Sequence, residues 1–176
     1  TLDLGDGQIF NTQENRVQVV EAIRRLRPSL IMTHGPNDRH PDHRHTNELV
    51  RDAAFMAHVG GFKAKGECWQ IEDIGFFPGN IFKPDQPMDW VVDISETFAV
   101  KCAALRAYAT QFLRNEDDEG PATYISGQEF WNTIELRSAL WAHRIDVAPG
   151  EPFMLERPAH ARHPLTRLCR PPETKL

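Results

Sequence analysis

The sequence has few cysteines and no long apolar run, and each absence argues against a class of protein. Its three cysteines, Cys68, Cys102 and Cys169, are an odd number without a CxxC pair. They fit neither a disulfide framework nor a Cys-rich zinc site, and they favour a reducing, cytoplasmic location. The apolar runs are only a few residues long, whereas a membrane-crossing helix needs ~20. We therefore expect a cytoplasmic protein with no membrane partner.

An excess of basic charge is also missing. The net charge is −5, from 20 basic and 25 acidic residues, which argues against a nucleic-acid partner because such domains present a basic face. The stretch 157–176 differs, with five basic residues, one acidic residue and four prolines. We expect one domain over residues 1–156 and a basic, Pro-rich tail over 157–176, either an arm onto a neighbouring subunit or a loose end.

Hydrophobic periodicity predicts an alternation of helices and strands. Helices are expected over 11–27 and 46–58 and after Ser95 and Ser126, and strands over 29–33, 68–77 and 90–94. The first helix has capping-box spacing between Asn11 and Glu14 and ends at Pro28. This alternation predicts an α/β fold with a mostly parallel sheet and helices on both faces. Its functional site is expected in loops at the carboxyl ends of the strands.

The loop after the strand at 29–33 contains the densest group of chemically active residues. Four of the eight histidines lie between His34 and His45, and two of them belong to the run His40-Pro41-Asp42-His43. Neutral imidazole is a good zinc ligand, and a nearby carboxylate can orient the ring through its other nitrogen. We predict that His40 and His43 form a site in which one binds metal and the other acts on substrate charge. Taken singly, the other histidines of the loop favour packing or surface roles.

Two stretches of this chain match the motifs of a known family. They are Asp38-Arg39-His40-Pro41-Asp42-His43-Arg44 and Val91-Val92-Asp93-Ile94-Ser95, with weaker matches spread between Thr1 and Phe153. The sequence thereby resembles the PIG-L/LmbE-like deacetylases, in particular the bacillithiol-biosynthesis type. Enzymes of that type remove an acetyl group from an N-acetylglucosamine conjugate.

The resemblance implies a Rossmann-like fold, a zinc cofactor, an acetylated amino-sugar conjugate as the small-molecule partner, and assembly as a homo-oligomer. By motif position, His43 would be a zinc ligand and His40 would stabilise the oxyanion. Asp42 would orient or tune His40, and Arg39 would contact substrate. We therefore expect a zinc-dependent hydrolase that cleaves the acetyl amide.

One part of the family pattern is missing. The family also uses a His-Pro-Asp-Asp element, which supplies two zinc ligands and the general base, and these residues contain no such element. We therefore expect an N-terminally incomplete domain that alone binds zinc weakly or not at all, since catalytic zinc sites normally use three protein ligands. Another metallohydrolase of the same fold and a non-catalytic binding module are the alternatives.

Overall fold

A computed structural model describes residues 1–79, 88–109, 111–112 and 123–157 of the chain. Beyond Arg157, the predicted basic tail lies outside the described residues. None of the described helices is long and apolar enough to cross a membrane.

Helices and strands alternate along the first half of the chain, as predicted. The elements are α1 (Gln13–Leu26), β1 (Leu30–His34), α2 (Pro41–Ala57), β2 (Asp73–Phe77), β3 (Trp90–Asp93), α3 (Phe98–Arg106), α4 (Gln128–Ala142), a 3-10 turn η1 (His143–Ile145) and β4 (Gly150–Leu155). The expected α/β class is confirmed.

The sheet has the strand order β1-β2-β4-β3, and its pairing differs in detail from the expected mostly parallel sheet. β1 and β2 are parallel, whereas β4 runs antiparallel to both β2 and β3. The sequence pattern did not predict β4, because a proline within a run argues against a central strand. Pro152 is accommodated where it lies opposite Val91 of β3, beyond the residues Met154 and Leu155 that pair with β2.

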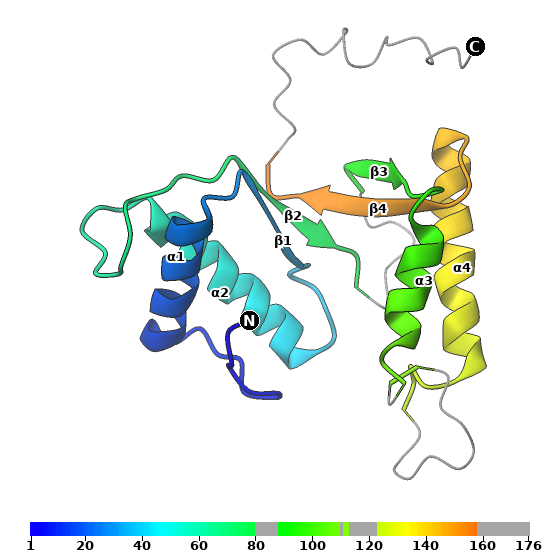
Figure 1. Cartoon of the computed structure of the whole chain (residues 1–176), viewed down its shortest axis with the longest axis horizontal. Coiled ribbons are helices and arrows are strands. Elements are labelled where there is room, and N and C mark those ends of the chain that lie inside the picture. The colour runs from blue at the N-terminus through cyan, green and yellow to red at the C-terminus, as the bar shows by residue number, and fades with distance from the viewer. Residues whose placement is uncertain (80–87, 110, 113–122, 158–176) are drawn as a thin grey trace, which may run out of the picture.

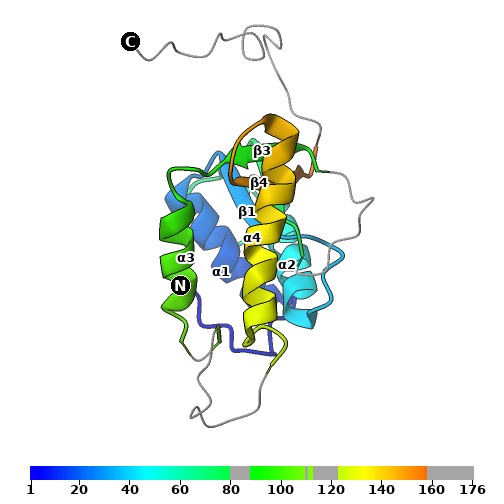
Figure 2. The ribbon, with the colours of Figure 1, turned by 90° about the vertical axis from the view of Figure 1, so that its right-hand side faces the viewer.

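The helices are divided between the two ends of the sheet. Figures 1 and 2 show α1 and α2 beside β1 and β2, and α3 and α4 near β3 and β4. The main core forms between the first pair of helices and the sheet, and it includes Val20, Ile23, Ala53, Ala54, Ile74, Phe76 and Met154. At the other end, α4 approaches β4 so closely that a Cβ on Gly150 would lie 2.9 Å from the backbone nitrogen of Ala142.

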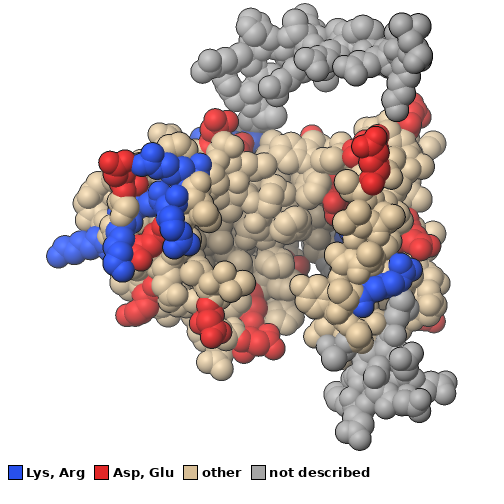
Figure 3. Space-filling view, viewed as in Figure 1, with Lys and Arg blue, Asp and Glu red and all other residues tan. Residues whose placement is uncertain are grey.

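A buried arginine of α1 forms hydrogen bonds with the end of α2 and the loop that follows it. Arg24 is only 4% exposed, and its guanidinium donates to the carbonyl oxygens of Ala57, Val59 and Ala64 at 3.1, 3.0 and 2.8 Å. Burying a charged group is favourable only when its donors are satisfied, and these carbonyls provide the acceptors. The remaining Lys and Arg side chains seen in Figure 3 gather mostly at this same end of the molecule.

The four described α-helices start at N-caps other than the predicted ones. Those of α3 and α4 are Thr97 and Gly127, in place of Ser95 and Ser126. The N-cap of α1 is Thr12, whose side chain accepts from the backbone N–H of Asn15, and not the predicted Asn11. α2 begins at Pro41, five residues before the predicted start at Thr46, with His40 as its N-cap. Proline suits the first helical position because its fixed φ matches the helix and no N–H is needed there. This early start puts the whole His-Pro-Asp-His run at the helix N-terminus.

Candidate metal centre and adjoining cavity

Three side chains of types that can bind a metal ion meet where β1 ends and α2 begins. His34 is the last residue of β1, Asp38 lies in the connecting loop, and His43 lies in the first turn of α2. Each offers one ligand atom, and these three atoms lie within 4.8 Å of one another. The rings of His34 and His43 are stacked, with centroids 3.8 Å apart and planes at 4°.

The carboxylate of Asp38 lies against the ring of His43. Its Oδ2 is 3.0 Å from His43 Nδ1, and that nitrogen is buried without a well-aligned hydrogen bond to the residues described. The other oxygen of Asp38 accepts from the backbone N–H of His40 at 2.9 Å. Asp38 is also only 9% exposed. Its two carboxylate oxygens therefore each have a neighbour inside the protein, one at His43 and one at the backbone of His40.

Two further side chains fix the backbone around the cluster. The amide of Asn47, which is 1% exposed, donates to the carbonyl oxygen of His34 at 2.7 Å. The guanidinium of Arg44 donates to the carbonyl oxygens of Asp38 and Arg39 at 3.0 and 2.9 Å. Both donors come from α2, so the helix holds the end of β1 and the loop in one arrangement.

The electrostatics favour the protonation states that bind a cation. Burial lowers the pKa of His34, the neighbouring His43 and His40 lower it further, and Asp38 acts in the opposite direction. Burial tends to raise the pKa of Asp38, but the backbone N–H of His40 and the contact with His43 outweigh it and lower that pKa. At neutral pH the site therefore contains a neutral His34 and an ionised Asp38.

This donor set fits a zinc ion. Two imidazole nitrogens and one carboxylate oxygen are ligands that zinc accepts, and the buried His43 Nδ1 has an anionic neighbour but no aligned hydrogen bond among the described residues. Asp38 has two roles open to it. It can bind the ion directly, or it can accept the Nδ1 proton of His43 and leave Nε2 to bind, as carboxylates commonly do beside zinc-binding histidines.

The sequence-predicted residues surround this cluster. The ring of His40 lies 4.7 Å from that of His43, and its Nδ1 accepts from the backbone N–H of Asp42 at 3.2 Å. The carboxylate of Asp42 accepts from the backbone N–H of Gly7 at 2.6 Å, so its described hydrogen bond is to the N-terminal segment. Arg39 is exposed, and its guanidinium carbon lies 5.2 Å from the centroid of the Tyr124 ring.

Sequence reasoning singled out His43 as a candidate ligand but did not predict that His34 and Asp38 lie beside it as further candidates. Neither belongs to the His-Pro-Asp-His run, and each taken alone is an ordinary polar residue of a loop or strand end. The available signal was position, because His34 ends β1 and Asp38 lies in the loop after it, and the site was expected at the carboxyl end of this strand.

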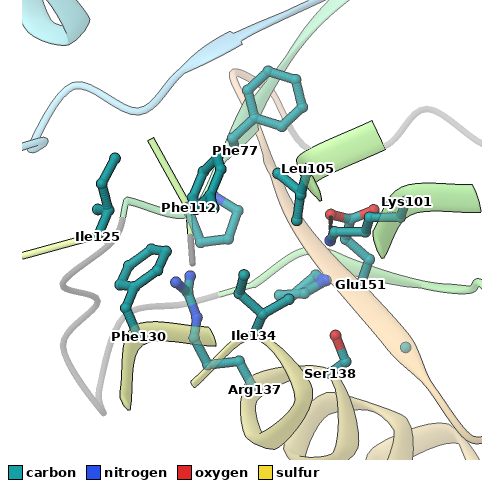
Figure 4. Close-up of a pocket in the computed structure, with 13 residues that line it drawn as sticks. Phe77, Lys101, Leu105, Phe112, Ile125, Phe130, Ile134, Arg137, Ser138 and Glu151 are labelled. Atoms are coloured by element: carbon teal, nitrogen blue, oxygen red, sulfur yellow. Dashed lines mark hydrogen bonds and ion pairs between the residues drawn. The ribbon is translucent and has the colours of Figure 1, made fainter. Parts of the chain in front are cut away.

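A cavity of about 240 Å³ lies near the cluster, between the end of β2 and the helices α3 and α4. Figure 4 shows its wall, which combines aromatic and aliphatic side chains with Arg137, Lys101 and Glu151. Phe77 adjoins both the cavity and the His/Asp cluster. It lines the cavity, and its ring centroid lies 6.3 Å from that of His34.

Residues 1–54 match the model of the PIG-L family, described as GlcNAc-PI de-N-acetylase. The matched segment contains α1, β1 and most of α2, and therefore all three residues of the cluster.

The chain is also similar, over a longer segment, to an enzyme of known name. The diacetylchitobiose deacetylase of Thermococcus kodakarensis is 32% identical over 119 residues, which cover 63% of this chain and 42% of that protein. The match thus spans less than half of the length of this relative.

Solved structures share the fold over most of the chain. The conserved protein TT1542 from Thermus thermophilus superposes with a TM-score of 0.76 at 26% identity, covering 89% of this chain and 64% of that one. GalB, the 4-carboxy-2-hydroxymuconate hydratase of Pseudomonas putida, superposes with a TM-score of 0.68 over 90% of this chain and 64% of that one. At 17% identity, the second likeness concerns the fold alone.

Proposed function

We propose that this chain forms part of a zinc-dependent deacetylase that hydrolyses the acetyl amide of an N-acetylglucosamine conjugate. The observation that carries the proposal is the meeting of His34, Asp38 and His43 inside the segment that matches the PIG-L family model. The proposal includes a single domain over 1–156, a cytoplasmic location and assembly as a homo-oligomer. A conjugate of the bacillithiol-biosynthesis type is the narrower form of the proposal.

His43 would hold the zinc ion, with His34 and Asp38 as its neighbours in the donor set. When bound, zinc polarises the acetyl carbonyl and lowers the pKa of a water molecule beside it. The buried Asp38 would keep the ring of His43 in one orientation, because its Oδ2 lies 3.0 Å from Nδ1. A fixed ring keeps its metal-binding nitrogen aimed at one point.

His40 would stabilise the negative charge that develops on the acetyl oxygen. Its Nδ1 accepts a hydrogen bond from the backbone N–H of Asp42, so the proton of the neutral ring is on Nε2. That N–H is then the donor for an oxyanion, and a donor fixed in place costs little reorganisation during the reaction. The position of His40 at the N-cap of α2 also puts the partial positive charge of the helix near the same oxygen.

Arg39 and Asp42 would have supporting roles. Arg39 is exposed beside Tyr124, where it can contact a part of the substrate that extends from the centre. Asp42 would tune His40 electrostatically from the same helical turn, while its hydrogen bond to Gly7 anchors that turn. The general base is not among these residues.

The decisive experiment compares two histidine variants of the intact protein, because these residues alone contain no His-Pro-Asp-Asp element. We expect His43→Ala to reduce zinc content, and His40→Ala to retain zinc but to release acetate from N-acetylglucosamine conjugates far more slowly. His58→Ala, an exposed histidine at the end of α2, is the matched control and should change neither quantity. Equal zinc content and equal activity in the His40 and His43 variants would overturn the assignment.

The same measurements separate the alternatives. Zinc binding without acetate release from any of these conjugates would favour another metal-dependent hydrolase of the same fold. The absence of both zinc binding and acetate release in the intact protein, and not merely in these residues alone, would favour a non-catalytic binding module.

A further inference from the structure

We propose that Tyr124 is a positioning residue, whose ring holds the guanidinium of Arg39 in place for the substrate. The inference rests on the proposed function, in which Arg39 contacts a part of the substrate that extends from the metal centre. It adds the residue that determines where this contact is made. Tyr124 comes from the segment before α4, far along the chain from Arg39.

The main chain at Arg39 is fixed beside the metal cluster. Arg39 comes directly before His40, the proposed oxyanion donor, and both residues are exposed. The carbonyl oxygen of Arg39 accepts a hydrogen bond from the guanidinium of Arg44 at 2.9 Å. The backbone N–H of His40 donates to the carboxylate of Asp38, also at 2.9 Å. These bonds hold the backbone of Arg39, but they do not restrain its long side chain.

The ring of Tyr124 supplies a contact for that side chain. The guanidinium carbon of Arg39 lies 5.2 Å from the centroid of the ring, which is within the range of a cation–π contact. Such a contact uses the charge of the guanidinium and leaves its N–H groups available to a hydrogen-bond acceptor. Tyr124 therefore limits the positions open to Arg39 without occupying the donors that a substrate would need.

Tyr124 has a rigid support on α4. Its ring meets that of Phe130 edge to face, with centroids 5.3 Å apart and planes at 73°, a favoured arrangement for two aromatic rings. Phe130 is only 7% exposed, whereas Tyr124 is 54% exposed. The tyrosine ring thus rests on a buried side chain and still presents much of its surface to a ligand.

The backbone that carries Tyr124 is held by Ser126. The hydroxyl of Ser126 donates to the carbonyl oxygen of Thr123 at 2.8 Å and accepts from the backbone N–H of Thr123 at 3.0 Å. The backbone N–H of Ser126 donates to the same carbonyl oxygen at 3.1 Å. Ser126 is 7% exposed, so little water competes for these bonds. Its side chain does not cap α4 and instead fixes the turn that presents Tyr124.

The pair formed by Arg39 and Tyr124 lies between the metal centre and the cavity. Arg39 belongs to the loop that carries the cluster, and Tyr124 is next to Ile125 and Phe130, which line the cavity (Figure 4). A conjugate that placed its acetyl amide at the cluster and extended toward the cavity would pass this pair. The N–H groups of Arg39 would then donate to oxygen atoms of the extending part.

The first test separates binding from turnover in the intact protein, with phenyl N-acetylglucosaminide as the probe. Tyr124→Leu should raise KM for acetate release about two- to fivefold, as expected for one exposed cation–π contact, and change kcat less than about twofold. Tyr124→Phe retains the ring and should restore a KM close to that of the unmodified protein. Tyr108→Leu, at an exposed tyrosine after α3, is the matched control and should change neither constant.

A double-mutant cycle shows whether Tyr124 acts through Arg39. Once Arg39→Gln has removed the guanidinium, Tyr124→Leu should have little further effect, so the two effects should not add. Additive effects would overturn the proposal. So would a Tyr124→Phe variant as impaired as Tyr124→Leu, because the hydroxyl and not the ring would then be responsible. Circular dichroism of each variant establishes that it folds.

A chemical measurement keeps the outcome separate from that of the proposed function. Phenylglyoxal modifies arginine side chains, and mass spectrometry locates the modified residues. Arg39 should react about two- to fivefold faster in Tyr124→Leu than in the unmodified protein, whereas the exposed Arg25 should react at the same rate in both. Faster modification of Arg39 without acetate release from any conjugate would retain the positioning by Tyr124 and reject the deacetylase. Acetate release together with an unchanged rate of Arg39 modification would do the reverse.

Discussion

Nδ1 of His43 lies 3.0 Å from Oδ2 of Asp38, although the two residues belong to a helix and to the loop before it. This pair combines a candidate metal ligand with a buried carboxylate that lies against its ring. The arrangement predicts that metal affinity depends on Asp38 as well as on the histidines.

Asp38→Asn should weaken zinc binding by about 10–100-fold, because the amide removes the negative charge beside His43. Competition with a chromophoric chelator measures this affinity. Asp52→Asn is the matched control, since Asp52 lies on the exposed side of α2 and should have no effect. Unchanged zinc affinity in Asp38→Asn would show that the carboxylate has no part in the metal centre.

His34→Ala should also lower zinc affinity, by about tenfold or more, if its ring completes the donor set. His45→Ala provides the comparison, because His45 lies in α2 close to His43 but its ring packs at 5.2 Å from that of Phe10. The same chelator competition applies. An equal loss of affinity in the two variants would point to a general disturbance of the structure around the cluster and would contradict a specific role for His34.

Arg24→Met should destabilise the protein by about 3 kcal/mol or more, because it leaves several loop carbonyl groups without their buried donor. Urea unfolding followed by circular dichroism gives the free energy of unfolding. The neighbouring Arg25→Met removes the same charge from an exposed position and should cost less than ~0.5 kcal/mol. Similar losses in both variants would mean that Arg24 acts only through its charge.

Asp42→Ala should destabilise the protein by about 1.5–3 kcal/mol, because a charged acceptor for the Gly7 N–H is lost. The segment before α1 should then exchange its amide hydrogens faster, which hydrogen exchange measured by mass spectrometry detects. Protection of this segment that does not change in Asp42→Ala would exclude the anchoring role.

Asp93 makes stability depend on pH at the acidic end of the range. Hydrogen bonds from the side chain and the backbone N–H of Ser95 hold the pKa of Asp93 below its ordinary value of 3.8. A lowered pKa contributes stability above pH 3.8, and this contribution is lost as the pH falls through the pKa of the folded state. Asp93→Ala should therefore reduce the difference in melting temperature between about pH 7 and about pH 3, whereas the exposed Glu135→Ala should not.

The parts of this molecule that sequence alone could predict are those determined by local pattern. The apolar run Leu30–Met32 indicated β1, and the His-Pro-Asp-His run indicated where chemistry takes place. Neither signal depends on distant residues, because helix periodicity and side-chain type are read within one segment. The start of α2 was misplaced because residues 40–45 are mostly polar, so the apolar helical pattern does not extend into the first turns of the helix.

The remaining features arise from contacts between distant segments. β4 carries Pro152, and only its pairing with β3 shows why a proline is tolerated there. The cavity is lined by both Phe77 and Arg137, which are 60 positions apart in the sequence. Such combinations depend on the packing of the helices against the sheet, which a single sequence does not record.

The position of β1 in the strand order has a consequence for assembly. Among the described strands, β1 pairs only with β2, so the backbone groups along its other edge are available to a further strand. The last residue of β1 is His34. Any segment that extended the sheet at this edge would therefore have its backbone next to a candidate metal ligand. Only every second side chain of such a strand would lie on the face of the sheet that His34 occupies. The open edge and the candidate metal centre thus meet at one residue.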